Sequence, residues 1–463
     1  MPALRTRPPR LRGDLLAVAL VSALVATAAL VGWALIDRGV DVLVGWPPLL
    51  AAWLPRVGPG TVPALLVGAL VVVAGPTVAQ RWRWGPLLGA SFVAAWLWTL
   101  TLALIDGWAI GVAERLATPS EYLVEIPIRG TVGEFLTTFA DRIPSFQPGA
   151  LVTHASGHPP AATLFYELLS RLGLGGPDWA GAITLTIGAS AVVPVALTLA
   201  AVADRDVDRD TARRYLPFGV LFPGAVWVGV SADGMFAAVF AWGVAFLALG
   251  AVRRSPAGAA LALLGGLVLG LSLFLSYGLA AAGLVPVAVA VLTRRVAPLV
   301  WGTLGVGVVV ALFAWGGFWW FDGYVQVQVR YYQPGEYGLR RPYAYWVWAN
   351  LAAVAFAVGP AVVAGVRRVG WWACGWIGRR RPAPDWWGRP HTAVVLLVAA
   401  GLAAVLAADL SGLSKAEVER IWLPFAVWLV PATTLLARTA TRPWLAAQAV
   451  LALAVNTLLA TVW

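Results

Sequence analysis

The chain has 463 residues, of which 60% are hydrophobic and only 12% are charged. Soluble proteins contain about 25% charged residues, and a soluble fold cannot bury so large an apolar fraction. The apolar residues fall in blocks of roughly 17 to 25, each long enough to cross a hydrocarbon core of about 30 Å as a helix. The composition therefore excludes an ordinary soluble fold and predicts a polytopic membrane protein.

The formal net charge of +11 does not indicate a nucleic-acid-binding protein, because the basic residues are scattered in short loops between apolar blocks. All the basic residues except Lys415 are arginines, which together with the abundance of alanine, glycine, valine and proline suggests a GC-rich bacterial genome. A single cysteine, Cys374, excludes an intrachain disulfide framework.

The fold class that we predict is all-α, with about thirteen transmembrane helices and an extracytoplasmic loop that carries interfacial helices. The first span follows a basic flank and is too long for a cleaved signal sequence, so we expect a retained anchor. The predicted spans are residues 15–36, 61–79, 85–105, 178–203, 215–231, 234–251, 257–275, 278–293, 298–320, 343–366, 392–409, 421–437 and 443–461.

The distribution of charge predicts a cytoplasmic N-terminus in a bacterial inner membrane. With that orientation, the inside loops hold 22 of the 33 basic residues and 6 of the 22 acidic ones, as the positive-inside rule requires. The pattern holds only if residues 158–174 form an amphipathic helix at the outer interface rather than another span. The chain then divides into N-terminal spans (1–105), an extracytoplasmic loop (106–177) and a multi-span domain (178–463).

The first outer loop opens with Asp106, which follows an apolar span directly and precedes a glycine. A carboxylate at such a boundary is partly desolvated and can act as a general base. The alternative is a simple Asp-Gly turn that ends the helix. For the later acids of this loop, ordinary solvation is the favoured interpretation.

His154 and His158 precede a predicted helix that begins with two prolines. We take both as candidate substrate-binding residues, because their spacing suits a metal site or a paired hydrogen-bonding site; a turn-and-cap role for one of them is an equally good interpretation. Because a third ligand is missing, we assign no metal site, and a requirement for a divalent cation stays open.

Three further residues lie where predicted spans meet the outer face. Asp233 lies at the tip of a helical hairpin, where it either caps the next helix or faces a polar cavity. Tyr277 lies in the next outer turn, and Asp322 follows an aromatic belt at the end of a span. We take all three as candidate substrate-binding residues.

Two C-terminal outer segments bring cations to the interface, where positive charge is otherwise disfavoured. Arg341, Lys415 and Arg420 are therefore candidate ligands for an anionic lipid phosphate, and Glu419 is a candidate substrate ligand. The alternative is local pairing, of Lys415 with Glu419 and of Arg420 with Glu417.

The sequence lacks a phosphate-binding glycine loop, a CxxC pair, a nucleophile elbow and a zincin motif. The acid-bearing outer loop that starts near Asp106, the His158-Pro159-Pro160 element and the hairpin acid Asp233 resemble the membrane-embedded GT-C glycosyltransferases. The likeness is greatest to the family of protein O-mannosyltransferases and bacterial aminoarabinose transferases. The GHPP element and the segment from Ser414 to Trp422 also resemble a group of actinobacterial integral membrane proteins.

This resemblance implies an inverting transfer of a hexosyl or pentosyl group from a polyprenyl-phosphate donor to a glycan, lipid or protein acceptor at the outer face. It implies that Asp106 acts as the base and that Arg341, Lys415 and Arg420 hold the donor phosphate. Two other classes stay open: a secondary transporter or flippase of envelope precursors, and a non-catalytic membrane scaffold.

Overall fold

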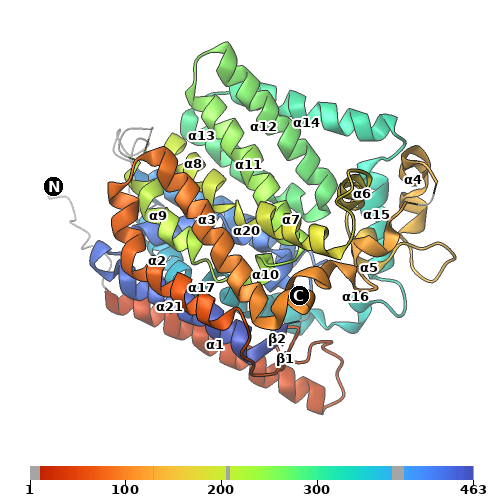
Figure 1. The fold of residues 1–463 in the computed structure, drawn as a ribbon, viewed down its shortest axis with the longest axis horizontal. Helices are drawn as coiled ribbons and strands as arrows, with labels where there is room; N and C mark the ends of the chain where they lie inside the picture. Colours follow the sequence, from red (N-terminus) through yellow and green to blue (C-terminus); the bar gives the residue numbers. More distant parts are fainter. Residues whose placement is uncertain (1–10, 129, 205–208, 378–389, 462–463) are drawn as a thin grey trace.

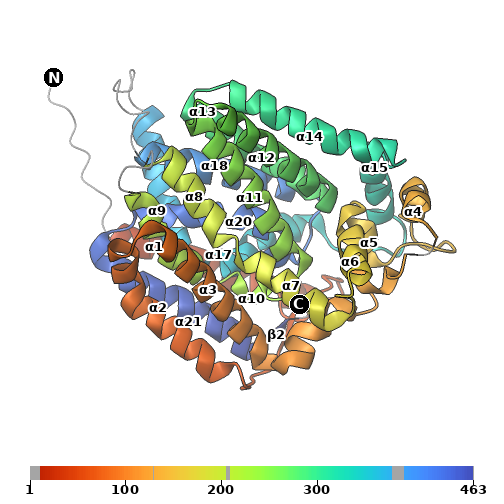
Figure 2. The ribbon, with the colours of Figure 1, turned by 45° about the horizontal axis from the view of Figure 1, so that its top comes forward.

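The computed structural model describes residues 11–128, 130–204, 209–377 and 390–461, which form a bundle of helices (Figure 1, Figure 2). Within these residues, nine helical segments are long and apolar enough to cross a membrane. They are α1 (Leu11–Asp37), α2 (Thr61–Arg81), α3 (Trp84–Ala103), α7 with α8 (Pro177–Ala189 and Val192–Val202), α11 (Ala232–Val252), α12 (Pro256–Leu275), α14 (Ala297–Trp315), α17 (Tyr343–Ile377) and α18 (Pro390–Leu410). The chain is therefore a helical polytopic membrane protein.

The predicted number of thirteen spans is not confirmed, because the other four segments form shorter or bent pieces. They are α9 (Asp210–Val220) and α10 (Ala225–Val228), η6 (Tyr277–Gly283) and α13 (Leu284–Thr293), α20 (Leu423–Ala426) and η8 (Val430–Leu435), and η9 (Arg438–Ala440) with α21 (Thr441–Leu458). The last two groups meet at a bend of 117°. Proline has no N–H group and interrupts helices, and it occurs in all four of these regions, as Pro217, Pro223, Pro286, Pro424, Pro431 and Pro443.

A break inside α17 shows how the bundle satisfies backbone groups that a helix releases. Gly359 has φ of 78°, which favours glycine, and Pro360 follows it. The side-chain amide of Gln448, from α21, accepts a hydrogen bond from Ala361 N at 3.2 Å and donates one to Val358 O at 2.9 Å. A buried glutamine thus replaces the helical hydrogen bonds, as an apolar environment requires.

The short elements gather mostly at one end of the bundle, on the right of Figure 1 and Figure 2. We call it the loop end, and it contains residues 38–60, 104–176, 316–342 and 411–422. Its elements are η1 (Leu104–Asp106), η2 (Ala109–Ala113), η3 (Arg115–Ala117), η4 (Tyr122–Glu125), α4 (Val132–Thr138), η5 (Ala140–Arg142), α5 (Thr153–Gly157), α6 (Ala161–Arg171), α15 (Trp320–Tyr331), α16 (Tyr337–Arg340) and α19 (Val418–Ile421). A two-stranded antiparallel sheet of β1 (Ala51–Trp53) and β2 (Leu459–Thr461) ties the loop between α1 and α2 to the C-terminal region.

The helix predicted at residues 158–174 is α6, and its 11 residues are too few to cross a membrane. Most of its side chains pack into the loop end, and only Leu168 and Arg171 are exposed. α6 is accordingly not one of the helices that are long and apolar enough to span a membrane.

A buried ion pair joins α1 to α17 at the end of the bundle opposite the loop end. Asp14 is fully buried and accepts hydrogen bonds from Arg367 at 2.7 Å and from Arg368 at 2.6 Å. A buried ion pair stabilises a fold little more than apolar side chains of similar volume would. Removal of one partner is nevertheless costly, because it leaves an uncompensated buried charge.

We expect Asp14→Asn to lower the free energy of unfolding by about 3 kcal/mol or more, because Arg368 loses its carboxylate partner. Thermal unfolding of the purified protein in detergent measures the effect. The matched control is Asp37→Asn on the same helix, where the carboxylate is exposed and the loss should be small. Equal melting temperatures for the two variants would contradict the prediction.

Candidate functional site

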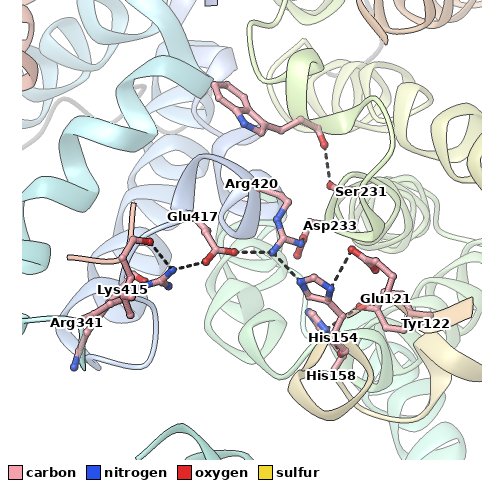
Figure 3. A network of polar contacts seen from close by, with 12 residues as sticks. Glu121, Tyr122, His154, His158, Ser231, Asp233, Arg341, Lys415, Glu417 and Arg420 are labelled. Atoms are coloured by element: carbon pink, nitrogen blue, oxygen red, sulfur yellow. Dashed lines mark hydrogen bonds and ion pairs between the residues drawn. The ribbon is translucent and has the colours of Figure 1, made fainter. Parts of the chain in front are cut away.

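A cluster of buried charged and aromatic side chains lies at the loop end (Figure 3). It is built from four parts of the chain that are far apart in sequence: the loop that follows Asp106, the start of α11, the segment after α16, and the segment around α19. We call it the loop-end cluster, and Figure 3 labels nine of its members: Glu121, Tyr122, His154, His158, Asp233, Arg341, Lys415, Glu417 and Arg420. The tenth is Glu419, which is buried and interacts electrostatically with Glu417, Arg420 and Arg341. Of the ten candidate residues, the structure brings together His154, His158, Asp233, Arg341, Lys415, Glu419 and Arg420.

Arg420 and Asp233 form the centre of the cluster. Arg420 Nη1 lies 2.6 Å from Asp233 Oδ2, and the two residues are only 4% and 2% exposed. Asp233 lies in the first turn of α11, but Ser231 is the N-cap residue and its hydroxyl donates to Trp227 O. Of the two roles predicted for Asp233, a polar partner inside the bundle fits better than a helix cap. The partner is an arginine from a distant segment.

Glu417 connects Arg420 to Arg341. Its Oε1 lies 2.7 Å from Arg341 Nη2, and its Oε2 lies 3.4 Å from Arg420 Nη2. Burial raises the pKa of Glu417, but the two arginines outweigh it and lower the pKa overall. The carboxylate is thus held ionised between two guanidinium groups. The predicted alternative pairing of Arg420 with Glu417 is confirmed.

The backbone that carries Glu417 is strained. Ala416 and Glu417 have φ of 66° and 62°, in the left-handed region that non-glycine residues seldom adopt. Asn350, from α17, holds this turn by accepting from Ala416 N at 3.1 Å and donating to Ser414 O at 2.8 Å. Strain of this kind persists only where surrounding contacts enforce it, and it concentrates at functional sites.

The predicted local ion pair of Lys415 with Glu419 is wrong, because neither carboxylate oxygen of Glu419 has a hydrogen-bond partner among the described residues. The Nζ of Lys415 donates to Gly338 O at 2.6 Å and lies over the rings of Tyr331 and Tyr332, at 5.8 and 5.6 Å. Burial, followed by the charge of Arg341, lowers the pKa of Lys415. Lys415 and Arg341 therefore add two closely spaced, partly desolvated cations to the cluster.

Glu419 is a buried carboxyl group with an exposed fraction of 1%. Within the described chain, no other residue donates a hydrogen bond to either of its oxygens. Burial raises its pKa to about 7, with a contribution from the charge of Glu417. Glu419 is thus partly protonated near neutral pH.

His154 is oriented by Glu121. Its Nδ1 lies 3.0 Å from Glu121 Oε1, and its Nε2 lies 3.5 Å from Arg420 Nη2. Arginine can only donate hydrogen bonds, so Nε2 is the acceptor and Nδ1 carries the hydrogen, on the side of the Glu121 carboxylate. The acidic partner thereby selects the tautomer whose basic nitrogen faces the centre of the cluster.

His158 stacks among aromatic rings and is held neutral. Its Nδ1 lies 2.8 Å from the Tyr122 hydroxyl and 2.9 Å from the carbonyl of His154, and its ring packs against Phe236. A carbonyl can only accept, so Nδ1 carries the hydrogen. Burial lowers the pKa of His158. This histidine fixes the turn between α5 and α6, which agrees with the turn-and-cap role that was one of the predicted alternatives.

Asp106 lies outside the loop-end cluster. Both of its oxygens are occupied by guanidinium groups: Arg56 contacts Oδ1 and donates to Oδ2 at 3.1 Å, and Arg115 donates to Oδ2 at 3.2 Å. Arg115 also donates to Thr461 O, in β2. The carboxylate therefore ties η1 and η3 to the loop between β1 and α2, and its lone pairs are engaged.

Tyr277 and Asp322 also lie apart from the cluster. The Tyr277 ring packs against Trp320 and Tyr324, at 5.2 and 6.0 Å between ring centroids. Asp322 is exposed in the first turn of α15. The structure thus joins these segments through aromatic packing, without bringing either side chain to Arg420.

A divalent cation finds no suitable ligand set here. Among the described residues, no group of three or more histidine, cysteine, aspartate or glutamate side chains could hold a metal ion. The Nδ1 atoms of His154 and His158 are directed at Glu121 and at a backbone carbonyl. No chemical step is therefore assigned to a metal.

Sequence reasoning missed Glu121 and Tyr122 as members of the site. Both lie more than 30 residues before the histidines, in a loop whose acidic residues were predicted to be ordinary solvated surface charges. The only signal for Glu121 was its charge, which does not distinguish it from the neighbouring acids Glu114, Glu125 and Glu134.

Comparison with known proteins gives no match: no protein-family model fits the chain, and no curated protein or solved structure is significantly similar to it. The candidate site consequently rests on the geometry described above.

We expect stability to depend on the protonation of Glu419. The pKa of Glu419 is raised in the folded state. Its contribution to the free energy of unfolding is therefore fully present below the pKa of the unfolded state, about 4.5, and is lost as the pH rises through the folded-state pKa of about 7. Glu419→Gln should therefore be more stable than the wild type at pH 8, by up to about 3 kcal/mol, with the difference shrinking toward pH 5.

Thermal unfolding of both proteins between pH 5 and 8 measures this difference. The control is Asp322→Asn, which removes an exposed carboxylate from the same end of the bundle. A constant difference between wild type and Glu419→Gln over this pH range would refute the prediction.

Proposed function

We propose that this protein is a membrane-embedded transferase that moves a sugar from a polyprenyl-phosphate donor to a hydroxyl group of an acceptor. The observation that carries the proposal is the convergence of Arg341, Lys415 and Arg420 with an oriented histidine–carboxylate pair in one buried cluster. The cations suit a leaving phosphate, and the pair suits activation of a hydroxyl.

The arginines already hold an anion in the fold, namely the carboxylate of Glu417. A phosphate also accepts hydrogen bonds from paired guanidinium donors and can replace this carboxylate between Arg341 and Arg420. Entry requires the side chain of Glu417 to turn away, because Arg420 is 4% exposed and Arg341 is 6% exposed. Negative charge grows on the phosphate as the bond to the sugar breaks, so these cations stabilise the transition state more than the bound donor.

His154 is the base that we assign to the acceptor hydroxyl. The Glu121 carboxylate, 3.0 Å from Nδ1, stabilises the imidazolium that forms when Nε2 takes a proton. Nε2 can act only when Arg420, which contacts it at 3.5 Å, turns to the phosphate. This assignment moves the base from Asp106, which is held by two guanidinium groups, those of Arg56 and Arg115. In our proposal Asp106 is a structural anchor of the first loop.

The reaction balances without a further reactant. The acceptor oxygen forms a bond to the anomeric carbon as its proton passes to His154 Nε2. The bond from that carbon to the phosphate oxygen breaks, and the phosphate leaves with the electron pair beside Arg341 and Arg420. Attack opposite the leaving group inverts the anomeric configuration.

The localisation that accompanies this proposal is the bacterial cytoplasmic membrane with the loop end outside. The polyprenyl chain of the donor would lie in the bilayer beside the bundle. The shape of the site determines which sugar and which acceptor it binds. A glycan, a lipid and a protein acceptor would each require a different shape.

We expect His154→Gln to reduce transfer at least about 100-fold and to leave donor binding nearly unchanged, because only the proton acceptor is lost. The assay follows release of polyprenyl phosphate by the purified protein, supplied with a panel of polyprenyl-phosphate sugars. His391→Gln, at the third histidine of the chain, is the matched control and should retain activity. A wild-type protein without transfer for any donor, with altered precursor uptake in the deletion strain, would favour the transporter class.

We expect Arg341→Gln to weaken donor binding, whereas Arg340→Gln should not. The two arginines are adjacent, but Arg341 is buried against Glu417 and Arg340 makes an exposed pair with Asp41. Loss of one phosphate contact at a buried site corresponds to about 10-fold or more in affinity. Titration of polyprenyl phosphate into each variant measures the difference, and equal affinities would remove Arg341 from the phosphate site.

A further inference from the structure

A second basic site lies at the end of the bundle opposite the loop end, between α2, α9 and α21. These helices contact one another and lie side by side on the left of Figure 1 and Figure 2. A cavity of about 600 Å³ lies between their ends. Its basic lining consists of Arg81, Arg213, Arg214, Arg438 and Arg442.

The charge of these arginines is largely uncompensated by the described residues. The cavity lining contains no described aspartate or glutamate. The nearest ion pair is that of Arg438 with Asp210, and both of its members are exposed. Exposed pairs of this kind contribute about 0 to 1 kcal/mol, so Asp210 neutralises the cavity poorly.

The guanidinium groups are held in place by uncharged acceptors. Arg213 donates to Ala79 O at 2.7 Å and to Trp82 O at 2.9 Å, at the end of α2. Arg214 donates to Leu436 O at 2.6 Å, and Arg442 donates to Val73 O at 3.2 Å. Backbone carbonyls orient the arginines without cancelling their charge, and each guanidinium has further N–H donors.

The arginines also oppose one another. Burial, and next the charge of Arg438, lower the pKa of Arg214. An anion between them would relieve this repulsion. The volume of the cavity is in the range of small-ligand sites, of roughly 300 to 1,000 Å³.

The surroundings favour a lipid as the source of the anion. α2 exposes Leu66, Leu70 and Val73 along the side that leads to the cavity, each by more than 60%. The cavity itself has an apolar wall formed by Pro76, Pro217, Phe218 and Pro443. A molecule with an anionic head and an apolar body fits this change from apolar helix surface to arginine.

We propose that the cavity between α2, α9 and α21 binds the phosphate headgroup of an anionic phospholipid. The site is independent of the proposed transferase activity, because it shares no residue with the loop-end cluster and lies at the other end of the bundle. It would hold a structural lipid of the leaflet on that side.

The test uses the full chain in detergent, with phosphatidylglycerol and phosphatidylcholine of identical acyl chains as probes and native mass spectrometry as the readout. We expect the double variant R81Q/R442Q to bind phosphatidylglycerol about thirtyfold more weakly than the wild type, from the loss of two cationic contacts. The matched control is R253Q/R254Q, which removes two exposed arginines from the turn between α11 and α12 and should bind like the wild type.

Three results would overturn the proposal: equal affinities of R81Q/R442Q and R253Q/R254Q, equal binding of the two lipids by the wild type, or full displacement of the lipid by inorganic phosphate at similar concentration. The last would identify a soluble anion as the occupant. If R81Q/R442Q fails to fold, the single variant R81Q replaces it, since Arg81 is exposed. A loss of about fivefold is then expected.

Discussion

Buried charge in an apolar bundle must find a partner, and this constraint organises the loop end of the protein. Asp233 begins a helix whose remaining residues are almost entirely apolar, and Arg420 reaches it from a segment 187 residues later. Neither charge could remain buried alone, because the cost of desolvation is several kcal/mol per ion. The pair therefore holds the start of α11 and the α19 segment in one arrangement.

The other members of the cluster depend on this pair. Arg420 also faces Glu417 and His154, so the strained turn at Glu417 and the short helix α5 both approach it. Glu121 then orients His154 from the first loop. Each charged residue of the cluster needs a partner in this apolar setting, and few alternative pairings exist. The contacts therefore specify one arrangement of the segments that carry these residues.

The arginines of the loop-end cluster and those of the cavity between α2, α9 and α21 have different partners. At the loop end, Arg341 and Arg420 are paired with carboxylates in the fold, so an incoming phosphate must displace Glu417. At the opposite end, Arg213, Arg214 and Arg442 are oriented by backbone carbonyls and keep their charge. This contrast suits a transient ligand at the first site and a resident one at the second.

The sequence by itself determined the class of the protein and several members of the site. Long apolar blocks require a membrane as solvent, and a charge in such a setting is conspicuous, which is why Asp233, His154 and Arg420 could be singled out. Hydropathy could not decide the number of spans, since an apolar segment buried among other helices looks like one that crosses lipid. The broken segments 215–231 and 421–437 illustrate this limit.

Only the tertiary structure decided the partners. Asp106 and Asp233 carry the same charge at similar helix boundaries, yet one meets Arg56 and Arg115 and the other meets Arg420. Glu121 could not be distinguished from its acidic neighbours until the fold brought it to His154. Partner choice depends on which distant segments pack together, and periodicity and composition carry no information about contacts across such distances.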